Sequence, residues 1–117
     1  MSEAAPTVEQ HFAGKDPLVR EVYDRLLSEI AKIGEVTEDP KKTSIHLSRR
    51  TAFAGVATRK NSLVLTLKAS EDIRSPRVKK HEQVSAKRWH LEVLLTSPGD
   101  VDAELVAWLK AAYAISE

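Results

Sequence analysis

The stretch 63–68, LVLTLK, decides the fold, because its leucines recur at every second position. In an extended chain the leucines at 63, 65 and 67 lie on one face, and Val64, Thr66 and Lys68 lie on the other. This alternation is typical of a β-strand with one buried face and one open face. We therefore expect a sheet that packs on one side and faces solvent on the other.

Three other segments continue this pattern around the stretch. Ile45 and Leu47 share a face in residues 43–50, and the apolar residues of 89–95 alternate in the same way. Residues 51–58 form a weaker predicted strand, with Gly55 at a possible bulge. Residues 70–87 are polar, contain Pro76 and show no long period, so we expect a loop with at most one helical turn there.

Helical patterns flank the strand region. Thr7 and Gln10 fit a capping box that opens a short helical turn, closed by Gly14. Asp16-Pro17 predicts the start of a long helix that Gly34 ends in a left-handed conformation. Its expected apolar stripe is Leu18, Val22, Leu26, Ile30 and Ile33. Ser97-Pro98 predicts the start of a C-terminal helix, whose stripe is Val101, Leu105, Trp108, Leu109 and Ala112.

The order of elements predicts an α+β fold. Short connections between the strands favour hairpins, and hence an antiparallel sheet of three to five strands. An N-terminal and a C-terminal helix are expected to pack together on one face of this sheet. We assign residues 7–117 to this single small domain and expect residues 1–6 to be a disordered N-terminus.

Composition excludes several classes of protein. The chain has 117 residues, 42% hydrophobic and 30% charged, which is typical of one soluble globular domain. No apolar run approaches the roughly 20 residues of a membrane helix, and the N-terminus has no secretory pattern, so we expect a cytoplasmic protein without a membrane partner. The absence of cysteine excludes disulfides, thiol nucleophiles and thiolate metal sites.

Charge is sorted by position along the chain. Residues 41–88 hold 13 Lys or Arg and three Asp or Glu, a net +10, whereas the whole chain carries only +1. The predicted helices thus hold much of the acid, and the strands and their loops hold the base. A clustered basic surface is the electrostatic signature of a protein that binds anions, nucleic acid above all. The competing interpretation is a solvated loop whose charges pair with the acidic helices.

The candidate anion-binding residues are the basic groups at the ends of the strands and in the 70–88 segment. They are Lys41, Lys42, Arg49, Arg50, Arg77, Lys79, Lys80, Lys87 and Arg88.

The open face of the sheet is a second candidate site. Alternation places His46, Ser48 and Arg50 on this face, beside Thr66, Lys68, His90 and Glu92. His46, His90 and Glu92 could together form a pocket, although exposed polar side chains are the simpler interpretation. Only six aromatic residues exist, and both tryptophans lie on apolar stripes. We therefore expect few exposed rings, which favours phosphates over stacked bases as the target.

No pattern of residues indicates catalysis, a metal or a cofactor. No pair of histidines has the spacing of a metal site, and no nucleophile elbow or glycine-rich phosphate loop is present. Asp100, Asp102 and Glu104 have the spacing of acids that complement a helix dipole.

Several strings in the chain resemble a bacterial family catalogued as domain of unknown function 5655. These strings are Thr7–Phe12 with Gly14 and Lys15, Tyr23–Leu27, Pro40–Leu47, Arg50–Val56, Leu63–Leu67, and Ser97–Asp102 with Leu109 and Tyr113. The resemblance implies no established activity and no catalytic residues. Similar domains are found alone or fused behind other modules, some nuclease-like, which favours a setting associated with nucleic acid. Some relatives carry a zinc-ribbon-like segment ahead of the Thr7 position, but a zinc-dependent role does not transfer to a chain without cysteine.

The sequence therefore predicts a non-enzymatic module that binds anionic partners, nucleic acid or a phosphate-bearing ligand, through a basic layer of sheet and loops. The alternative is a protein-interaction module, most simply a homodimer. The least favoured hypothesis is a small enzyme that uses His46, His90 and Glu92.

Overall fold

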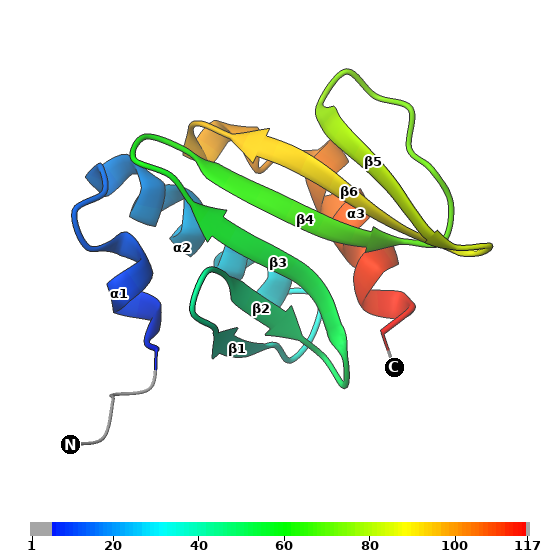
Figure 1. Cartoon of the computed structure of the whole chain (residues 1–117), viewed down its shortest axis with the longest axis horizontal. Coiled ribbons are helices and arrows are strands. Elements are labelled where there is room, and N and C mark those ends of the chain that lie inside the picture. Colours follow the sequence, from blue (N-terminus) through cyan, green and yellow to red (C-terminus); the bar gives the residue numbers. More distant parts are fainter. Residues whose placement is uncertain (1–5, 117) are drawn as a thin grey trace.

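A computed structural model describes residues 6–116 of the chain. Its centre is a six-stranded antiparallel sheet with the strand order β1-β2-β3-β4-β6-β5 (Figure 1). The strands are β1 (Thr37–Pro40), β2 (Ile45–Ser48), β3 (Ala52–Thr58), β4 (Leu63–Ala69), β5 (Val78–Ser85) and β6 (Arg88–Leu95). The helices are α1 (Val8–Phe12), α2 (Pro17–Ala31), α3 (Ala103–Ala114) and the short 3₁₀ turn η1 (Pro98–Asp100).

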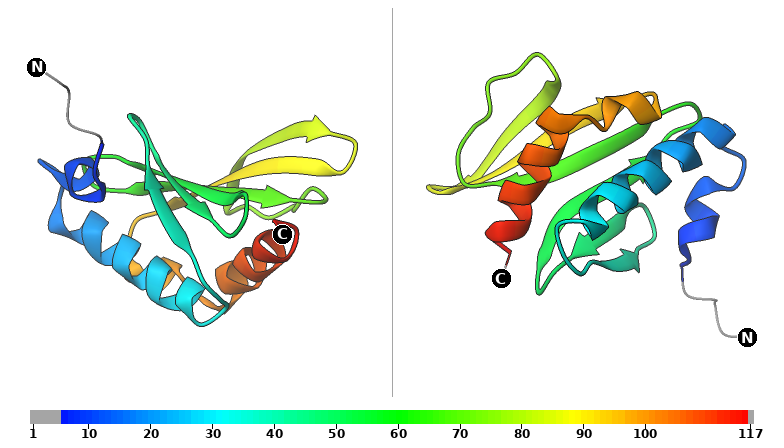
Figure 2. Two further views of the ribbon diagram at one scale, coloured as in Figure 1. Left: turned by 90° about the horizontal axis from the view of Figure 1, so that it is seen from below. Right: turned by 180° about the vertical axis from the view of Figure 1, so that it is seen from behind.

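Helices α2 and α3 cover one face of the sheet, as the sequence predicted (Figure 2). The leucines of β4 at 63, 65 and 67 are buried beneath them, while Val64, Thr66 and Lys68 remain partly exposed on the opposite side. Tyr23 of α2 and Leu105 of α3 are fully buried in the same core. The sheet therefore has a packed face and an open face, and the open face carries the polar residues of β2, β4 and β6.

The predicted helix starts are largely confirmed. Thr7 and Gln10 form the capping box of α1, and Gly14 follows that helix with a φ of 74°. Asp16 caps α2 by accepting a hydrogen bond from the backbone N–H of Leu18. Helix α1 packs at the end of the sheet where Thr58 Oγ1 donates to the carbonyl of His11.

The predicted number of strands, three to five, is wrong because two edge strands lack an alternating apolar pattern. Strand β1 has the sequence TEDP, in which no two apolar residues alternate. Strand β5 lies inside the segment that was predicted to be a loop. Every residue of this strand after Val78 is exposed, so its sequence shows no alternation of apolar and polar residues. An edge strand that buries almost nothing on either face gives no periodic signal.

Three local predictions also need correction. Gly34 does not have a positive φ; a Cβ there would collide with the ring of Tyr113, whose hydroxyl donates to the carbonyl of Glu35 over 2.8 Å. Gly55 lies in regular pairing, and the register shift falls between Leu47 and Ser48. Ser97-Pro98 starts η1 rather than α3, which begins later behind its cap, Asp102.

Two further predictions concern the long helix and the N-terminus. In α2, Val22, Leu26 and Ile30 are buried as expected, but Val19 replaces Leu18 at the start of the stripe. The disorder expected for residues 1–6 lies outside the described residues except for Pro6, which is exposed.

Within residues 6–116, no helix is both long and apolar enough to cross a membrane.

Candidate functional site

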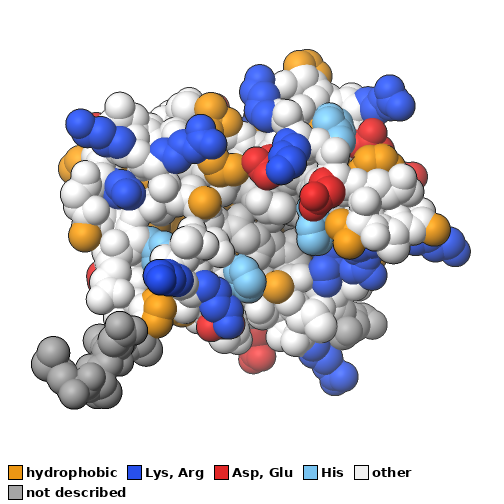
Figure 3. All heavy atoms as spheres, viewed as in Figure 1, with side chains coloured by type: hydrophobic (Ala, Val, Ile, Leu, Met, Phe, Trp, Pro, Cys, Tyr) orange, Lys and Arg blue, Asp and Glu red, His pale blue; other side chains and the backbone are white. Residues whose placement is uncertain are grey.

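The open face of the sheet contains a groove that follows β3. The outward-facing residues of this strand are small, namely Ala52, Gly55 and Ala57. Larger side chains stand on the neighbouring strands, so β3 becomes the floor of a hollow of about 300 Å³. Figure 3 looks onto this face and shows it hollowed near its centre, with Lys, Arg and His side chains around the hollow and Asp or Glu side chains at its upper right. A volume of this size lies at the lower end of the range typical of small-molecule sites, roughly 300–1,000 Å³.

Polar side chains form the walls of the groove. His46 of β2 pairs with Gly55 on one side, and Thr66 of β4 pairs with Gly55 on the other. Lys68 lies one step further along β4, directly opposite His90 of β6. Among residues 6–116, those that line the groove include a lysine, two histidines, a threonine and a serine, but no carboxylate. The groove is therefore a concave surface with hydrogen-bond donors, and the carboxylate of Glu82 lies just outside its lining, 3.8 Å from the ring of His90.

Lys68 is the most unusual charged group in this groove. It is half-buried, and its Nζ donates a hydrogen bond to Thr51 Oγ1 over 3.1 Å. Burial lowers the pKa of Lys68, and the nearby positive charge of Arg88 lowers this pKa further. Among the described residues, no carboxylate lies within ion-pair distance of Lys68. An anion placed beside its ammonium group would supply the missing counter-charge.

The predicted pocket of His46, His90 and Glu92 is brought together only in part. His46 and His90 line the same groove, whereas Glu92 lies outside it and faces Lys80, with 3.8 Å between the charged atoms. In register, β3 and β4 separate His46 from Glu92. Three strand spacings amount to about 14 Å between their backbones. Acid–base catalysis requires contact directly or through one water, so this geometry does not support the enzyme hypothesis.

The candidate anion-binding residues at the ends of β2 lie at opposite ends of the sheet. Lys41 and Lys42 lie in the exposed turn between β1 and β2, where Lys41 pairs with Asp39 over 2.9 Å. Arg49 lies at the other end, with its guanidinium 4.5 Å from the ring centre of Tyr113. Arg50 is exposed in the turn that leads into β3. These four residues therefore do not form one patch.

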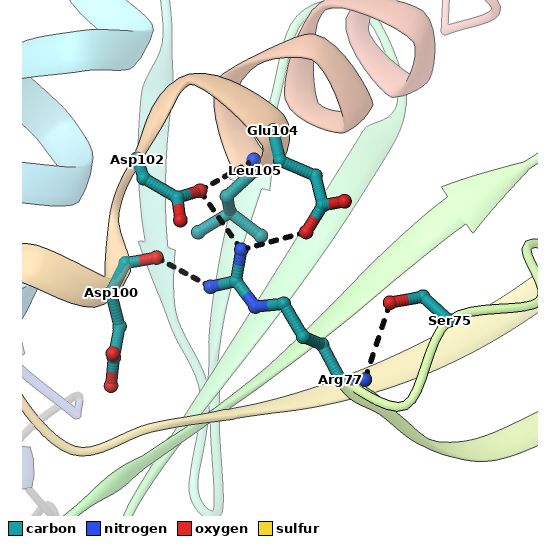
Figure 4. Close-up of polar contacts among 6 residues, drawn as sticks. All are labelled: Ser75, Arg77, Asp100, Asp102, Glu104 and Leu105. Carbon is teal, nitrogen blue, oxygen red and sulfur yellow. Dashed lines mark hydrogen bonds and ion pairs between the residues drawn. The ribbon is translucent and has the colours of Figure 1, made fainter.

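Arg77 is bound to the start of α3 rather than being part of a free basic surface. Its guanidinium donates to Asp102 over 2.8 Å, to Glu104 over 3.1 Å and to the carbonyl of Asp100 over 2.6 Å (Figure 4). The same group lies 5.8 Å from the ring centre of Trp108. The acids that were predicted to complement the dipole of the C-terminal helix thus also neutralise a base of the preceding segment. For this residue, the competing interpretation of pairing with an acidic helix fits the geometry.

The remaining candidates lie on β5 and β6. Lys79 and Lys80 are exposed on the edge strand, and Lys80 faces Glu92. Lys87 is exposed in the β5–β6 turn, and Arg88 is half-buried at the start of β6. Arg88 lowers the pKa of Lys68, so this predicted anion-binding residue acts electrostatically on a residue that lines the groove.

Sequence reasoning placed Lys68 on the open face but did not include it among the anion-binding candidates. The signal that could have found it is the combination of a lysine that alternates with core leucines and a facing strand of small residues, Ala52, Gly55 and Ala57. Among residues 6–116, no group of three or more His, Asp or Glu residues is arranged to hold a metal ion.

Comparisons with known proteins give one match. The family model "Domain of unknown function (DUF5655)" matches residues 8–116, nearly the whole chain. Searches of curated proteins and of solved structures found no match. The matched range includes every helix and strand described above, the groove and the Arg77 cluster. The chain therefore belongs to the DUF5655 family.

Proposed function

We propose that this protein is a non-enzymatic module that binds anionic, phosphate-bearing partners, nucleic acid among them, through the open face of its sheet. The observation that carries the proposal is Lys68, a half-buried cation in a groove that no carboxylate lines. A cation held in this way costs folding free energy, because its charged form is disfavoured by burial. A bound anion offsets that cost, so the arrangement favours anion binding over a purely structural role.

The surroundings of the groove support the same assignment. Arg50, Lys68, Lys87 and Arg88 all lie toward the end of the sheet where β2 and β4 end and β6 begins. The lower right of the face in Figure 3 shows Lys and Arg side chains over this end. Such an array would attract a polyanion and strengthen its binding at low salt.

The test is the binding of a labelled single-stranded oligonucleotide at two salt concentrations. We expect measurable affinity at low salt, a decrease at high salt, and an affinity about tenfold weaker for Lys68→Ala. Lys110→Ala is the matched control, because Lys110 is an exposed lysine on α3, in the helical layer, and its loss removes the same charge. Absence of binding at low salt, or equal loss in both variants, would refute the proposal.

A second candidate function is self-association through the edge of the sheet. In the structure of residues 6–116, strand β5 pairs only with β6, and Val84 on it is 54% exposed. Exposed strand edges can pair with a second copy, although the charges of Lys79, Lys80 and Glu82 oppose this. Mass determination at low and high salt separates the two functions: a monomer at both salts removes self-association and leaves the anion-binding proposal intact.

A further inference from the structure

The chemistry of the groove narrows the class of anion that it would hold. A site for phosphate alone needs only converging donors, whereas this groove also has a floor of small apolar residues along β3. Sites that hold organic molecules combine an apolar surface with a few placed polar groups. The groove has this combination, because Lys68 and Thr66 stand on one wall and His46 stands across the floor.

The fold does not require a glycine at position 55, in the floor of the groove. The backbone of Gly55 does not have a positive φ, and an added Cβ would meet only Thr66 Cβ, at an ordinary contact distance of 4.0 Å. A β-branched residue would also suit a strand better than glycine does. Neither backbone conformation nor packing therefore requires glycine here. What its missing side chain provides is access to the strand backbone between His46 and Thr66.

The walls of the groove also contain two imidazole rings, which the sequence analysis did not consider as surfaces for stacking. His46 and His90 both line the groove, and imidazoles can stack on nucleic-acid bases. Among the described residues, neither His46 nor the hydroxyl of Thr66 has a polar side-chain partner, so both remain available to a ligand. A flat ring can therefore lie on the floor beside an imidazole, with Thr66 within the same groove.

From these features we propose that the groove holds one nucleotide, with its phosphate at Lys68 beside Arg88 and its base on the floor at Gly55. The nucleotide is either a free molecule or one unit of a single strand, because both present the same phosphate, sugar and base. The volume of about 300 Å³ suits one such unit. This inference rests on the proposed function and adds the class of ligand and the role of Gly55.

The experiment measures the affinities of five probes for the whole chain. The probes are uridine 5′-monophosphate, uridine, ribose 5-phosphate, inorganic phosphate and a short single-stranded oligouridylate. We expect the mononucleotide to bind at least tenfold more tightly than any of its three fragments. If the strand binds far more tightly than the mononucleotide, the source is nucleic acid; if the two are similar, it is a free nucleotide.

Two substitutions separate the two ends of the nucleotide. Lys68→Ala should weaken the mononucleotide and ribose 5-phosphate by about tenfold and leave uridine unchanged. Gly55→Val fills the floor and should weaken the mononucleotide and uridine at least tenfold, while ribose 5-phosphate changes little. Gly99→Val is the matched control, because a Cβ at Gly99 meets only Ser97 Oγ at 3.8 Å, outside the groove. Circular dichroism and thermal unfolding must show Gly55→Val to be folded, with Gly55→Ala as the milder replacement.

The failures of the two proposals are distinguishable. If no phosphate-bearing probe binds at low salt, the proposed function fails and the nucleotide inference fails with it. If the oligouridylate binds with a dependence on salt and on Lys68, but folded Gly55→Val binds every probe as the native chain does, only the nucleotide inference is overturned. Equal binding of ribose 5-phosphate and the mononucleotide overturns it as well.

Discussion

Arg77 and Lys68 are two half-buried cations in the same basic stretch, and their surroundings are opposite. Arg77 donates to Asp102 and Glu104 and lies against Trp108, so its charge is balanced inside the molecule. Within the described part of the chain, Lys68 donates only to the neutral hydroxyl of Thr51, and it lies near another cation, Arg88. A basic run in the sequence therefore contains charges with different roles. One contributes to holding a segment against a helix, and we propose that the other binds a partner from outside.

The difference between them arises from the layers of the fold. The segment before β5 passes over the N-terminal end of α3, where acids complement the helix dipole and also meet Arg77. The side chain of Lys68 points away from both helices, on a face where β3 carries only small residues. Whether a cation lacks a carboxylate partner therefore depends more on its distance from the acidic helices than on the number of basic residues in the stretch.

The largest expected effect is on binding by charge reversal at the groove. Lys68→Glu should weaken oligonucleotide binding by about 10–100-fold, because it removes one charge-assisted contact and adds a repulsive one. The free energy of unfolding should change by less than about 0.5 kcal/mol, since no carboxylate partner is lost. Fluorescence anisotropy and urea unfolding measure the two quantities. Lys110→Glu is the control, and equal weakening by both variants would contradict a localised site.

Arg77→Ala should show the reverse pattern. Loss of its bonds to Asp102, Glu104 and the Asp100 carbonyl should lower the free energy of unfolding by about 1–3 kcal/mol, the range for hydrogen bonds with charged partners. Oligonucleotide affinity should fall by no more than about threefold, because a charge outside the binding site acts only through a screened long-range attraction. Arg74→Ala is the control, because that side chain is 92% exposed and should leave stability unchanged. If the Arg77→Ala variant were stable but did not bind the oligonucleotide, Arg77 and Lys68 would belong to one binding region, which would contradict the comparison.

Acid should weaken the Arg77 region. Hydrogen bonds from the backbone of Thr96 and Ser97 lower the pKa of Asp100, and the backbone N–H of Leu105 together with Arg77 lowers the pKa of Asp102. Both carboxylates thus bind protons less readily in the folded state. Their contribution to stability is complete above the unfolded pKa of about 3.9 and is lost as pH falls through the folded values.

Urea unfolding at several values between about pH 5 and pH 2 measures this loss. Asp100→Asn keeps an oxygen acceptor for the two N–H groups but has no titrating charge, so its stability should fall less steeply over the same range. An identical slope in the native chain and the variant would show that Asp100 does not contribute.

The smallest expected effect tests the cost of the unpaired cation. Lys68→Met keeps a long side chain and removes the disfavoured charge, so the free energy of unfolding should stay equal or rise by up to about 0.5 kcal/mol. The corresponding change at the balanced cation, Arg77→Met, should lower it. Urea unfolding of the two variants side by side gives the contrast. A clear loss of stability in Lys68→Met would mean that the hydrogen bond from Lys68 to Thr51 outweighs the cost of the buried charge.

The parts of the fold that the sequence predicts are those with a periodic apolar pattern. The leucines of β4, the stripe of α2 and the caps at Thr7 and Asp16 each have a local signal with a physical cause. Strands β1 and β5 bury too little to leave such a signal, so their existence depends on pairing with β2 and β6. The family resemblance was also readable from spaced strings, and the match over residues 8–116 confirms it.

The candidate site was predictable only in outline. Alternation placed His46, Lys68 and His90 on one face, but the groove depends on which strand lies between them. That strand is β3, and its small outward residues acquire meaning only once the pairing places it between β2 and β4. The pairing of Arg77 could not be predicted, because its partner Asp102 is 25 residues away in the chain and no local pattern specifies that contact.

The most direct test of the central claim is an NMR titration of the ¹⁵N-labelled protein with a short single-stranded oligouridylate at low salt. The account predicts that amide shifts change most at the groove, in particular at His46, Gly55, Thr66, Lys68 and His90, and that they are lost in Lys68→Ala. The amides around Arg77 and the start of α3 should remain nearly unchanged. Changes centred on Arg77 and α3, or no changes at all, would contradict the claim that the cation left unpaired on the open face is the one that binds.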